Sequence, residues 1–243
     1  MPRHRDAIRG QPSAGLAIFV KTPGLSPVKS RLWPALGREL AERLYRRMAA
    51  AVAGSARPLP RSELTRYWAI AEAHPLARRC WRTLPTLPQG DGDLGSRMHT
   101  VQQALRTRHR SWLLTGADAV LLHARNDLRP ALDWLAHPAP RIVFGPAADG
   151  GFWLVGGNVR VPEPIWQHPR YSSPQALGDL LDALRNAAER PEVQLLPAAS
   201  DLDTIDDLPA VLSGLRASRT LQREQRRLLR QLLALEGIIA VPG

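Results

Sequence analysis

The sequence predicts a three-layer α/β fold, in which helices cover both faces of a mostly parallel sheet. Short apolar runs alternate with longer amphipathic segments along the chain, which is typical of strands followed by helices. Neither a proline-rich linker nor an internal repeat divides the 243 residues, a length that suits one α/β domain. Alternating strands and helices favour parallel pairing, because each helix carries the chain back to the edge where the previous strand began.

The expected strands are short buried runs bounded by turn residues, at 15–20, 67–71, 112–115, 142–144, 152–155 and 193–196. The expected helices cover 37–53, 94–106, 126–135 and 173–188, and another begins after the acidic turn 201–207. In the first helix, Leu40, Leu44, Met48 and Val52 recur every four residues and form an apolar stripe. We expect a domain at 15–217, preceded by a flexible tail at 1–14.

The last segment, 218–243, is predicted to be an amphipathic helical appendix. Its helix covers 220–236 and is expected to end at Gly237, because glycine commonly terminates helices. Leucines at 221, 228, 229 and 232 form one face and arginines at 223, 226, 227 and 230 another. We expect the apolar face to pack on its own domain. A homodimer contact is the alternative, and membrane-surface binding ranks third because the helix has no Trp or Phe anchor.

The composition indicates which kind of partner the protein is expected to bind. The net charge is +11, but only two of the 33 basic residues are lysines, and the arginines are spread along the chain. Because no aromatic-basic RNA motif or zinc-finger spacing accompanies them, nucleic acid is not the expected partner. A basic surface would instead attract anionic substrates such as nucleotides.

The sequence also predicts a compartment. The single cysteine, Cys80, excludes a disulfide within the chain and fits a reducing environment. No apolar run is long enough for a transmembrane helix, and the N-terminal segment lacks the apolar core of a secretory signal. We therefore expect a cytoplasmic protein.

The first of five polar loops follows the strand at 15–20, and ligands of open α/β sheets bind at the carboxyl ends of strands. Lys21, Lys29 and Arg31 lie within eleven residues of this loop, which two prolines stiffen. Such a loop can surround a polyphosphate, with lysine as a point charge and arginine as a bidentate donor. Taken alone, a solvated basic loop is the simpler explanation.

The second loop, 89–98, reads Gln-Gly-Asp-Gly-Asp-Leu-Gly-Ser-Arg-Met. Its glycines permit tight turns and close approach of the backbone to a ligand. The N-terminus of the helix that follows favours an anion or a polar ligand edge. Asp93 is also a typical N-cap residue for that helix, and both interpretations can hold together.

Three further loops carry carboxylates. Asp118 follows a strand and is well placed for Mg²⁺, which takes one or two carboxylates plus substrate phosphates. Asp149 opens an Asp-Gly-Gly turn between two apolar runs, which is equally typical of a hairpin. Asp203 lies in the acidic turn 201–207, which can supply a second metal ligand or can begin a capped helix.

Taken together, these motifs resemble a small bacterial family of glycosyltransferase-like proteins, also labelled rSAM/selenodomain-associated transferases, among the GT-A-fold nucleotide-diphospho-sugar transferases. The family pattern K-x-P-x-x-G-x-V-K-T-R-L, Q-x-x-G-D-L-G-x-R-M, G-x-D-x-P, F-G-P-x-x-D-G-G-F-Y-L, W-S-T and D-I-D-T-x-E-D-L has counterparts, in order, between Lys21 and Leu208. The departures are Ser26 for a glycine, the conservative Ser30 for a threonine, Ala119-Val120 after Asp118, and Tyr171-Ser172-Ser173 for Trp-Ser-Thr.

The resemblance implies a metal-dependent transferase with a nucleotide or nucleotide-sugar donor. It implies that Asp118 and Asp203 bind Mg²⁺ or Mn²⁺, and that Asp149 acts as general base or holds an acceptor hydroxyl. The cations of the first loop would hold the donor phosphates, and the loop 89–98 would line the base and ribose. The residues implied to bind substrate are Lys21, Lys29, Arg31, Gln89, Gly92, Asp93, Leu94, Gly95, Arg97, Gly150 and Gly151.

Glycosyl transfer from a nucleotide-sugar is the reaction expected first. Nucleotidyl transfer with release of pyrophosphate is the alternative, because the same fold serves both. A degenerate protein that binds nucleotides or protein partners without turnover is a third interpretation, which the altered residues Ser26 and Ala119-Val120 favour.

Overall fold

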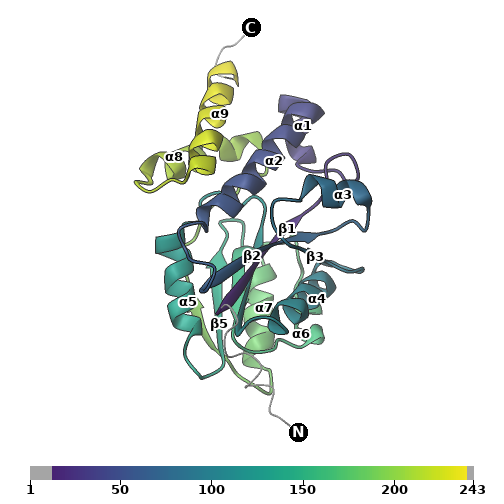
Figure 1. Cartoon of the computed structure of the whole chain (residues 1–243), viewed down its shortest axis with the longest axis vertical. Coiled ribbons are helices and arrows are strands. Elements are labelled where there is room, and N and C mark those ends of the chain that lie inside the picture. The colour runs from purple at the N-terminus through teal and green to yellow at the C-terminus, as the bar shows by residue number, and fades with distance from the viewer. Residues whose placement is uncertain (1–12, 240–243) are drawn as a thin grey trace.

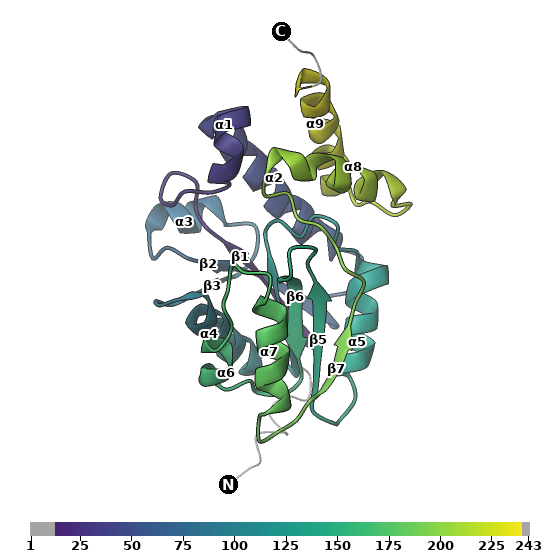
Figure 2. The same ribbon diagram turned by 180° about the vertical axis from the view of Figure 1, so that it is seen from behind.

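The computed structural model describes residues 13–239, in which a seven-stranded sheet forms the middle of three layers (Figures 1 and 2). The strand order is β3-β2-β1-β4-β6-β5-β7. Parallel pairs join β1 to β2 and β4, β2 to β3, and β5 to β7, whereas β6 is antiparallel to β4 and β5. The prediction of a mostly parallel sheet is confirmed. The strands are β1 (Ala14–Val20), β2 (Leu64–Ile70), β3 (Thr86–Pro88), β4 (Ser111–Gly116), β5 (Arg141–Pro146), β6 (Phe152–Gly157) and β7 (Glu192–Leu195).

Helices cover both faces of the sheet. Leu16 and Ile18 of β1 belong to an apolar cluster shared with α2, α5, α8 and α9, while Ala17 belongs to a second cluster shared with α4, α6 and α7. Burial on both faces explains why β1 is a continuous apolar run instead of an alternating one. The helical segments are η2 (Ser30–Leu32), α1 (Trp33–Leu36), α2 (Arg38–Ser55), α3 (Pro75–Cys80), α4 (Leu94–Arg106), η3 (Ala124–Leu128), α5 (Arg129–Leu135), α6 (Glu163–Gln167), α7 (Ala176–Arg185), η4 (Ile205–Asp207), α8 (Leu208–Ala217) and α9 (Arg223–Ile239).

The observed elements differ from the sequence prediction mainly at boundaries. The four short elements α1, α3, β3 and α6 were not predicted, because so few residues show no periodicity. The buried strand β1 begins at Ala14, inside the predicted tail, and positions 1–12 of that tail lie outside the described residues. The expected helix end at Gly237 is wrong, since α9 continues to Ile239 and Gly237 does not adopt the positive φ of a terminating glycine.

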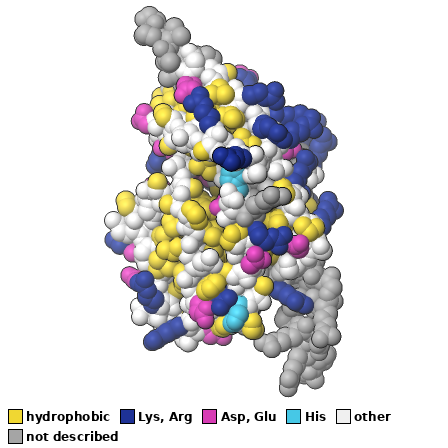
Figure 3. All heavy atoms as spheres, turned by 90° about the vertical axis from the view of Figure 1, so that its left-hand side faces the viewer, with side chains coloured by type: hydrophobic (Ala, Val, Ile, Leu, Met, Phe, Trp, Pro, Cys, Tyr) yellow, Lys and Arg dark blue, Asp and Glu magenta, His cyan; other side chains and the backbone are white. Residues whose placement is uncertain are grey.

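The C-terminal helix α9 packs on its own chain. It lies against α2 and α8, at the end of the molecule that also holds α1 (Figure 1). Leu228 and Leu232 are fully buried there and Leu235 nearly so, all within the apolar cluster that contains α2. A homodimer through α9 therefore stays a prediction that would have to use the remaining surface of the helix. On the face shown in Figure 3, Lys and Arg side chains are densest toward this end of the molecule.

One side chain of α9 also fixes a loop at the carboxyl edge of the sheet. Gln225 is fully buried, and its Nε2 donates to the carbonyl oxygens of Val120 and Leu122, both at 3.1 Å. Its Oε1 accepts from the backbone N–H of Gln222 at 3.1 Å. Buried carbonyls must find a donor, so α9 supplies the partners that the loop after β4 lacks. Between residues 13 and 239, no helix has the length and apolar character that crossing a membrane requires.

We predict that Gln225→Leu lowers the free energy of unfolding by about 1–3 kcal/mol, because two buried carbonyl groups lose their donor. Gln231 offers a matched control on the same helix, since its Oε1 is buried without a partner among the described residues. Gln231→Leu should therefore be neutral or stabilising. Guanidinium unfolding of both variants measures the difference, and equal effects would contradict the role given to Gln225.

Candidate functional site

A cleft of about 540 Å³ opens at the carboxyl edge of the sheet, where the loops after β1, β3, β4 and β7 meet. We call it the main cleft. It brings together side chains that lie far apart in the sequence, as expected for a ligand site of an α/β sheet. Nine of the residues predicted for the site line it: Lys21, Lys29, Arg31, Gln89, Gly92, Leu94, Arg97, Asp118 and Asp203.

The centre of the main cleft is an ion triplet. The ammonium of Lys29 lies 2.9 Å from Oδ2 of Asp118 and 2.5 Å from Oδ1 of Asp203. Arg31 adds a longer contact, with Nη1 3.8 Å from Oδ2 of Asp203. The Lys29 side chain is only 6% exposed, and its backbone adopts the left-handed region at φ 46° and ψ 42°. This backbone conformation is strained for a non-glycine residue, and such strain is typical of functional sites.

Lys29 and Asp118 each stabilise the charged form of the other. Burial by itself would lower the pKa of the Lys29 ammonium, but Asp118 and Asp203 outweigh it and raise that pKa above its usual value. Burial likewise opposes ionisation of Asp118, yet Lys29 holds the pKa of that carboxyl below its usual value. At neutral pH Lys29 is therefore a cation and Asp118 a carboxylate.

The arrangement of Asp118 and Asp203 around the Lys29 ammonium bears on whether these carboxylates suit a metal ion. Asp118 and Asp203 both contact the Lys29 ammonium, so both carboxylates face the same region of the main cleft. Within residues 13–239, no group of three or more His, Cys, Asp or Glu side chains forms a metal cage. The donor set thus fits Mg²⁺ or Mn²⁺ whose coordination is completed by substrate phosphates and water, and does not fit a closed structural site.

The loop that carries Lys29 is held by Glu72, at the end of β2. The Glu72 carboxylate accepts hydrogen bonds from the Thr22 backbone N–H at 2.9 Å, the Thr22 hydroxyl at 2.7 Å and the Ser26 hydroxyl at 2.6 Å. Ser26 does not have a positive φ, so its backbone does not require glycine. The departure at Ser26 therefore supplies a hydrogen bond and leaves the loop intact.

Gln89 is fixed in one orientation. It is 4% exposed, and its Nε2 donates to the carbonyl oxygens of Val20 at 3.2 Å and Ala69 at 2.9 Å. Both amide hydrogens are thereby used at the ends of β1 and β2. The Oε1 atom keeps its acceptor capacity, since no hydrogen bond to another described residue occupies it. Gln89 thus offers the main cleft a positioned hydrogen-bond acceptor.

Two predicted residues of the second loop do not line the main cleft. Asp93 caps α4, because its Oδ1 accepts from the Ser96 backbone N–H at 2.8 Å. Gly95 packs against α6, where a Cβ would lie 2.2 Å from the Trp166 carbonyl oxygen. These positions shape the start of α4, from which Leu94 and Arg97 reach the cleft.

Three more predicted residues, Asp149, Gly150 and Gly151, form the hairpin turn between β5 and β6 and also lie outside the lining of the main cleft. Asp149 is exposed, and its Oδ1 accepts from the Gly151 backbone N–H at 3.0 Å. Gly150 has φ 87°, and a Cβ there would lie 2.1 Å from the Pro174 carbonyl oxygen. Glycine is therefore required by the turn and by the close approach of the neighbouring loop.

Sequence reasoning did not single out Asp201, a half-buried carboxyl near the triplet. Burial, followed by the nearby charges of Asp118, Asp149 and Asp203, raises the pKa of Asp201 to about 7, although Lys29 opposes this. Asp149 therefore lies close enough to the acidic cluster to influence it. The signal available in the sequence was the acidic turn itself, in which several carboxylates follow one strand.

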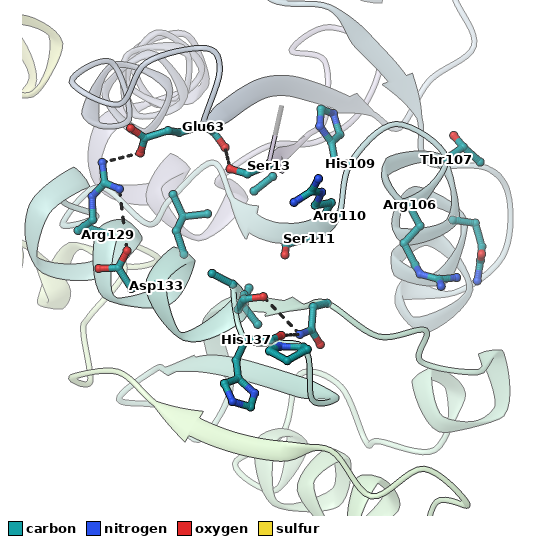
Figure 4. Close-up of a pocket in the computed structure, with 17 residues that line it drawn as sticks. Ser13, Glu63, Arg106, Thr107, His109, Arg110, Ser111, Arg129, Asp133 and His137 are labelled. Atoms are coloured by element: carbon teal, nitrogen blue, oxygen red, sulfur yellow. Dashed lines mark hydrogen bonds and ion pairs between the residues drawn. The ribbon is translucent and has the colours of Figure 1, made fainter. Parts of the chain in front are cut away.

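A larger cavity than the main cleft lies at the opposite edge of the sheet (Figure 4). It measures about 920 Å³, and none of the predicted site residues lines it. Figure 4 shows Arg129 between Glu63, at 2.6 Å, and Asp133, at 4.0 Å, so this charge is already neutralised by neighbours. Size alone thus does not identify the functional site, and the chemistry of the lining favours the main cleft.

Comparisons with known proteins agree with this assignment of the fold. A family model described as "Uncharacterized protein conserved in bacteria (DUF2064)" matches residues 61–173. A solved structure from Desulfovibrio desulfuricans G20, provisionally described as a nucleotide-diphospho-sugar transferase, is 26% identical with a TM-score of 0.77, covering 95% of this chain and 100% of that one. No significant match was found among curated proteins.

More distant structures share the fold alone. CMP:2-keto-3-deoxy-manno-octonic acid synthetase complexed with CTP is 13% identical with a TM-score of 0.51, covering 84% of this chain and 97% of that one. A cytidylyltransferase from Leptospira borgpetersenii is 13% identical with a TM-score of 0.52, covering 96% and 98%. The resemblance to GT-A-fold nucleotide-diphospho-sugar transferase-like proteins is therefore confirmed, and the chain has the fold of nucleotide-using transferases.

The contacts of Glu72 predict a pH dependence. Burial would raise the pKa of this carboxyl, but the hydrogen bonds from Ser26 and Thr22 outweigh burial and hold the pKa below its usual value. A carboxyl with a lowered pKa in the folded state stabilises the protein above its unfolded pKa, and this contribution is lost as pH falls through the folded value. As the pH falls from about 5 to about 3, the free energy of unfolding of Glu72→Gln should therefore decrease less than that of the wild type.

Denaturant unfolding at a series of pH values measures this dependence. Glu192→Gln is a suitable control, because Glu192 is an exposed carboxylate paired with Arg141 away from the main cleft. Parallel pH profiles for Glu72→Gln and the wild type would show that Glu72 does not hold the loop.

Proposed function

We propose that the protein is a metal-dependent glycosyltransferase that uses a nucleotide-sugar donor. The observation that carries the proposal is the Lys29 ammonium between Asp118 and Asp203, inside a cleft at the carboxyl edge of the sheet. A nucleoside diphosphate bound with a divalent cation needs cationic side chains for its phosphates and carboxylates for the metal. The 26% identical structure described provisionally as a nucleotide-diphospho-sugar transferase supports this class of donor.

The donor diphosphate would be held by Lys21, Lys29 and Arg31. Lys21 and Arg31 have exposed side chains that line the cleft and can close on an incoming anion, Arg31 from its long contact with Asp203. Lys29 would exchange a carboxylate partner for a phosphate oxygen when Asp118 and Asp203 bind Mg²⁺ or Mn²⁺. Because an ammonium keeps three donors, this exchange does not require it to leave the cleft.

The nucleoside would lie along β3 and the start of α4. The Oε1 atom of Gln89 can accept a hydrogen bond from an N–H group of the base. Gly92 and Leu94 line this part of the cleft, and Arg97, which donates to the Gly92 carbonyl oxygen at 3.0 Å, stiffens this wall. The departures at Ser26 and Ala119-Val120 leave these contacts in place, which favours an active protein over a degenerate one.

The reaction is a substitution at the anomeric carbon of the donor sugar. The acceptor oxygen forms a bond to that carbon as the bond to the diphosphate oxygen breaks, and the electron pair leaves with the nucleoside diphosphate. The acceptor proton passes to a carboxylate, for which we propose Asp149. Lys21, Lys29 and Arg31 stabilise the charge on the departing diphosphate, and a divalent cation held by Asp118 and Asp203 would add Lewis-acid stabilisation of that charge.

The first test concerns the donor. We expect UDP or another nucleoside diphosphate to bind more tightly with Mn²⁺ than without it, and Asp118→Ala to remove this difference while the protein stays folded. Lys29→Ala should weaken diphosphate binding by about ten-fold or more, because a charge-assisted contact contributes roughly 1.5–3 kcal/mol. Isothermal titration calorimetry measures both effects.

Asp182→Ala is the control, since Asp182 is an exposed carboxylate on α7, away from the main cleft. It should bind nucleotide and Mn²⁺ as the wild type does. If folded Asp118→Ala still binds the nucleotide more tightly with Mn²⁺ than without it, Asp118 is not the metal ligand. If the wild type binds no nucleoside diphosphate and no nucleotide-sugar, the proposed function is contradicted.

The second test concerns the reaction. With water as a slow acceptor, the protein should release nucleoside diphosphate from its nucleotide-sugar, and Asp149→Asn should lower this rate by about 100-fold or more without changing donor affinity. Chromatography of the nucleotide products measures the rate, and Asp182→Asn serves as the surface control. Release of pyrophosphate from a nucleoside triphosphate in its place would favour nucleotidyl transfer, and an unchanged rate in Asp149→Asn would exclude it as the base.

A further inference from the structure

A second cavity lies at the same edge of the sheet as the main cleft. It measures about 420 Å³ and is walled by the loops that follow β4, β5 and β7. The two cavities share the segment 117–123. Ala117 and Asp118 line the main cleft, whereas Ala119 and the residues 121–123 line the second cavity. A ligand in the second cavity would therefore lie on the other side of Asp118 from the proposed donor.

The lining of the second cavity differs in chemistry from that of the main cleft. It consists mostly of alanine, leucine and proline side chains, with Trp153 of β6 as a flat aromatic wall. None of its lining residues in the described part of the chain is Lys or Arg, whereas Lys21, Lys29, Arg31 and Arg97 line the main cleft. Phosphate groups are recognised by cationic donors. The second cavity thus lacks what a phosphate needs and suits an apolar body.

A few polar side chains also line this cavity. His123, Asn126 and Ser200 can exchange hydrogen bonds with a hydroxyl or a similar neutral group. The carboxylate of Asp127 is buried and accepts from the His123 backbone N–H at 2.7 Å, so it is occupied in holding the loop. Ligand pockets of this size commonly combine an apolar lining with a few polar groups that fix orientation.

We propose that the second cavity binds the acceptor, and that the acceptor is an uncharged molecule with an apolar body of about the size of one or two rings and a hydroxyl group. The term acceptor rests on the glycosyltransferase function proposed above. The binding site itself rests only on the cavity and its lining. Asp149 adjoins this cavity through Ala148, which lies on its wall.

The probe for this site is 2-naphthol, which is neutral and apolar and carries one hydroxyl group, with glucose as a polar comparison. Saturation-transfer NMR titrations should show that 2-naphthol binds the wild type and that glucose binds at least about ten-fold more weakly. Ala198→Trp fills the cavity from an exposed loop position on its wall and should weaken 2-naphthol binding by about ten-fold or more.

Ala188→Trp is the matched control, because Ala188 is an exposed loop alanine at the opposite edge of the sheet, before β7. It should bind 2-naphthol as the wild type does. Ala148→Trp fills the cavity from the hairpin side and replaces Ala198→Trp if that variant does not fold. Wild-type affinity in both filled variants, or no preference for 2-naphthol over glucose, would overturn the proposal.

Calorimetry with UDP and Mn²⁺ on the same proteins separates this inference from the proposed function. Nucleotide should bind Ala198→Trp and the wild type within about two-fold of each other, because the substituted side chain lies outside the main cleft. If nucleotide binds and 2-naphthol does not, the second cavity is not an apolar site and the proposed donor site stands. If 2-naphthol binds and no nucleotide does, the acceptor role is overturned together with the proposed function.

Discussion

The ammonium of Lys29 between Asp118 and Asp203 is the contact on which the rest of the site depends. It joins the loop after β1 to the loop after β4 and to the acidic turn after β7, three segments widely separated in the sequence. A buried ammonium requires partners, and two carboxylates this close together require a cation. This mutual requirement explains why Lys29 tolerates a left-handed backbone and why Glu72 fastens the loop that presents it.

The composition of the protein makes the identity of this residue informative. Arginine is by far the commoner basic residue in this chain, and the only two lysines both lie in the first loop and line the main cleft. An ammonium is a compact point charge that fits between two carboxylates, whereas a planar guanidinium is wider and prefers bidentate contacts. The geometry at Lys29 therefore supplies a physical reason why arginine would not serve there.

The C-terminal helix α9 supports the loop that carries Asp118. Its leucines complete the apolar cluster around α2, and Gln225 holds the carbonyl groups of Val120 and Leu122. The segment 117–123 thus has the ion triplet at one end and α9 at the other. Because this segment separates the main cleft from the second cavity, α9 influences the shape of both without lining either.

The sequence by itself determined the alternation of strands and helices, since buried parallel strands are continuous apolar runs and longer helices show a regular apolar stripe. It also determined that Lys29, Asp118 and Asp203 belong to loops at one edge of the sheet. Only the tertiary structure decided which loop residues face the main cleft: Asp93 and Gly95 shape α4, and Asp149 lies in the hairpin turn. It alone placed Asp201 beside the acidic cluster and Gln225 under the loop after β4. These outcomes depend on side-chain direction and on contacts between distant segments, and neither is encoded in local periodicity or spacing.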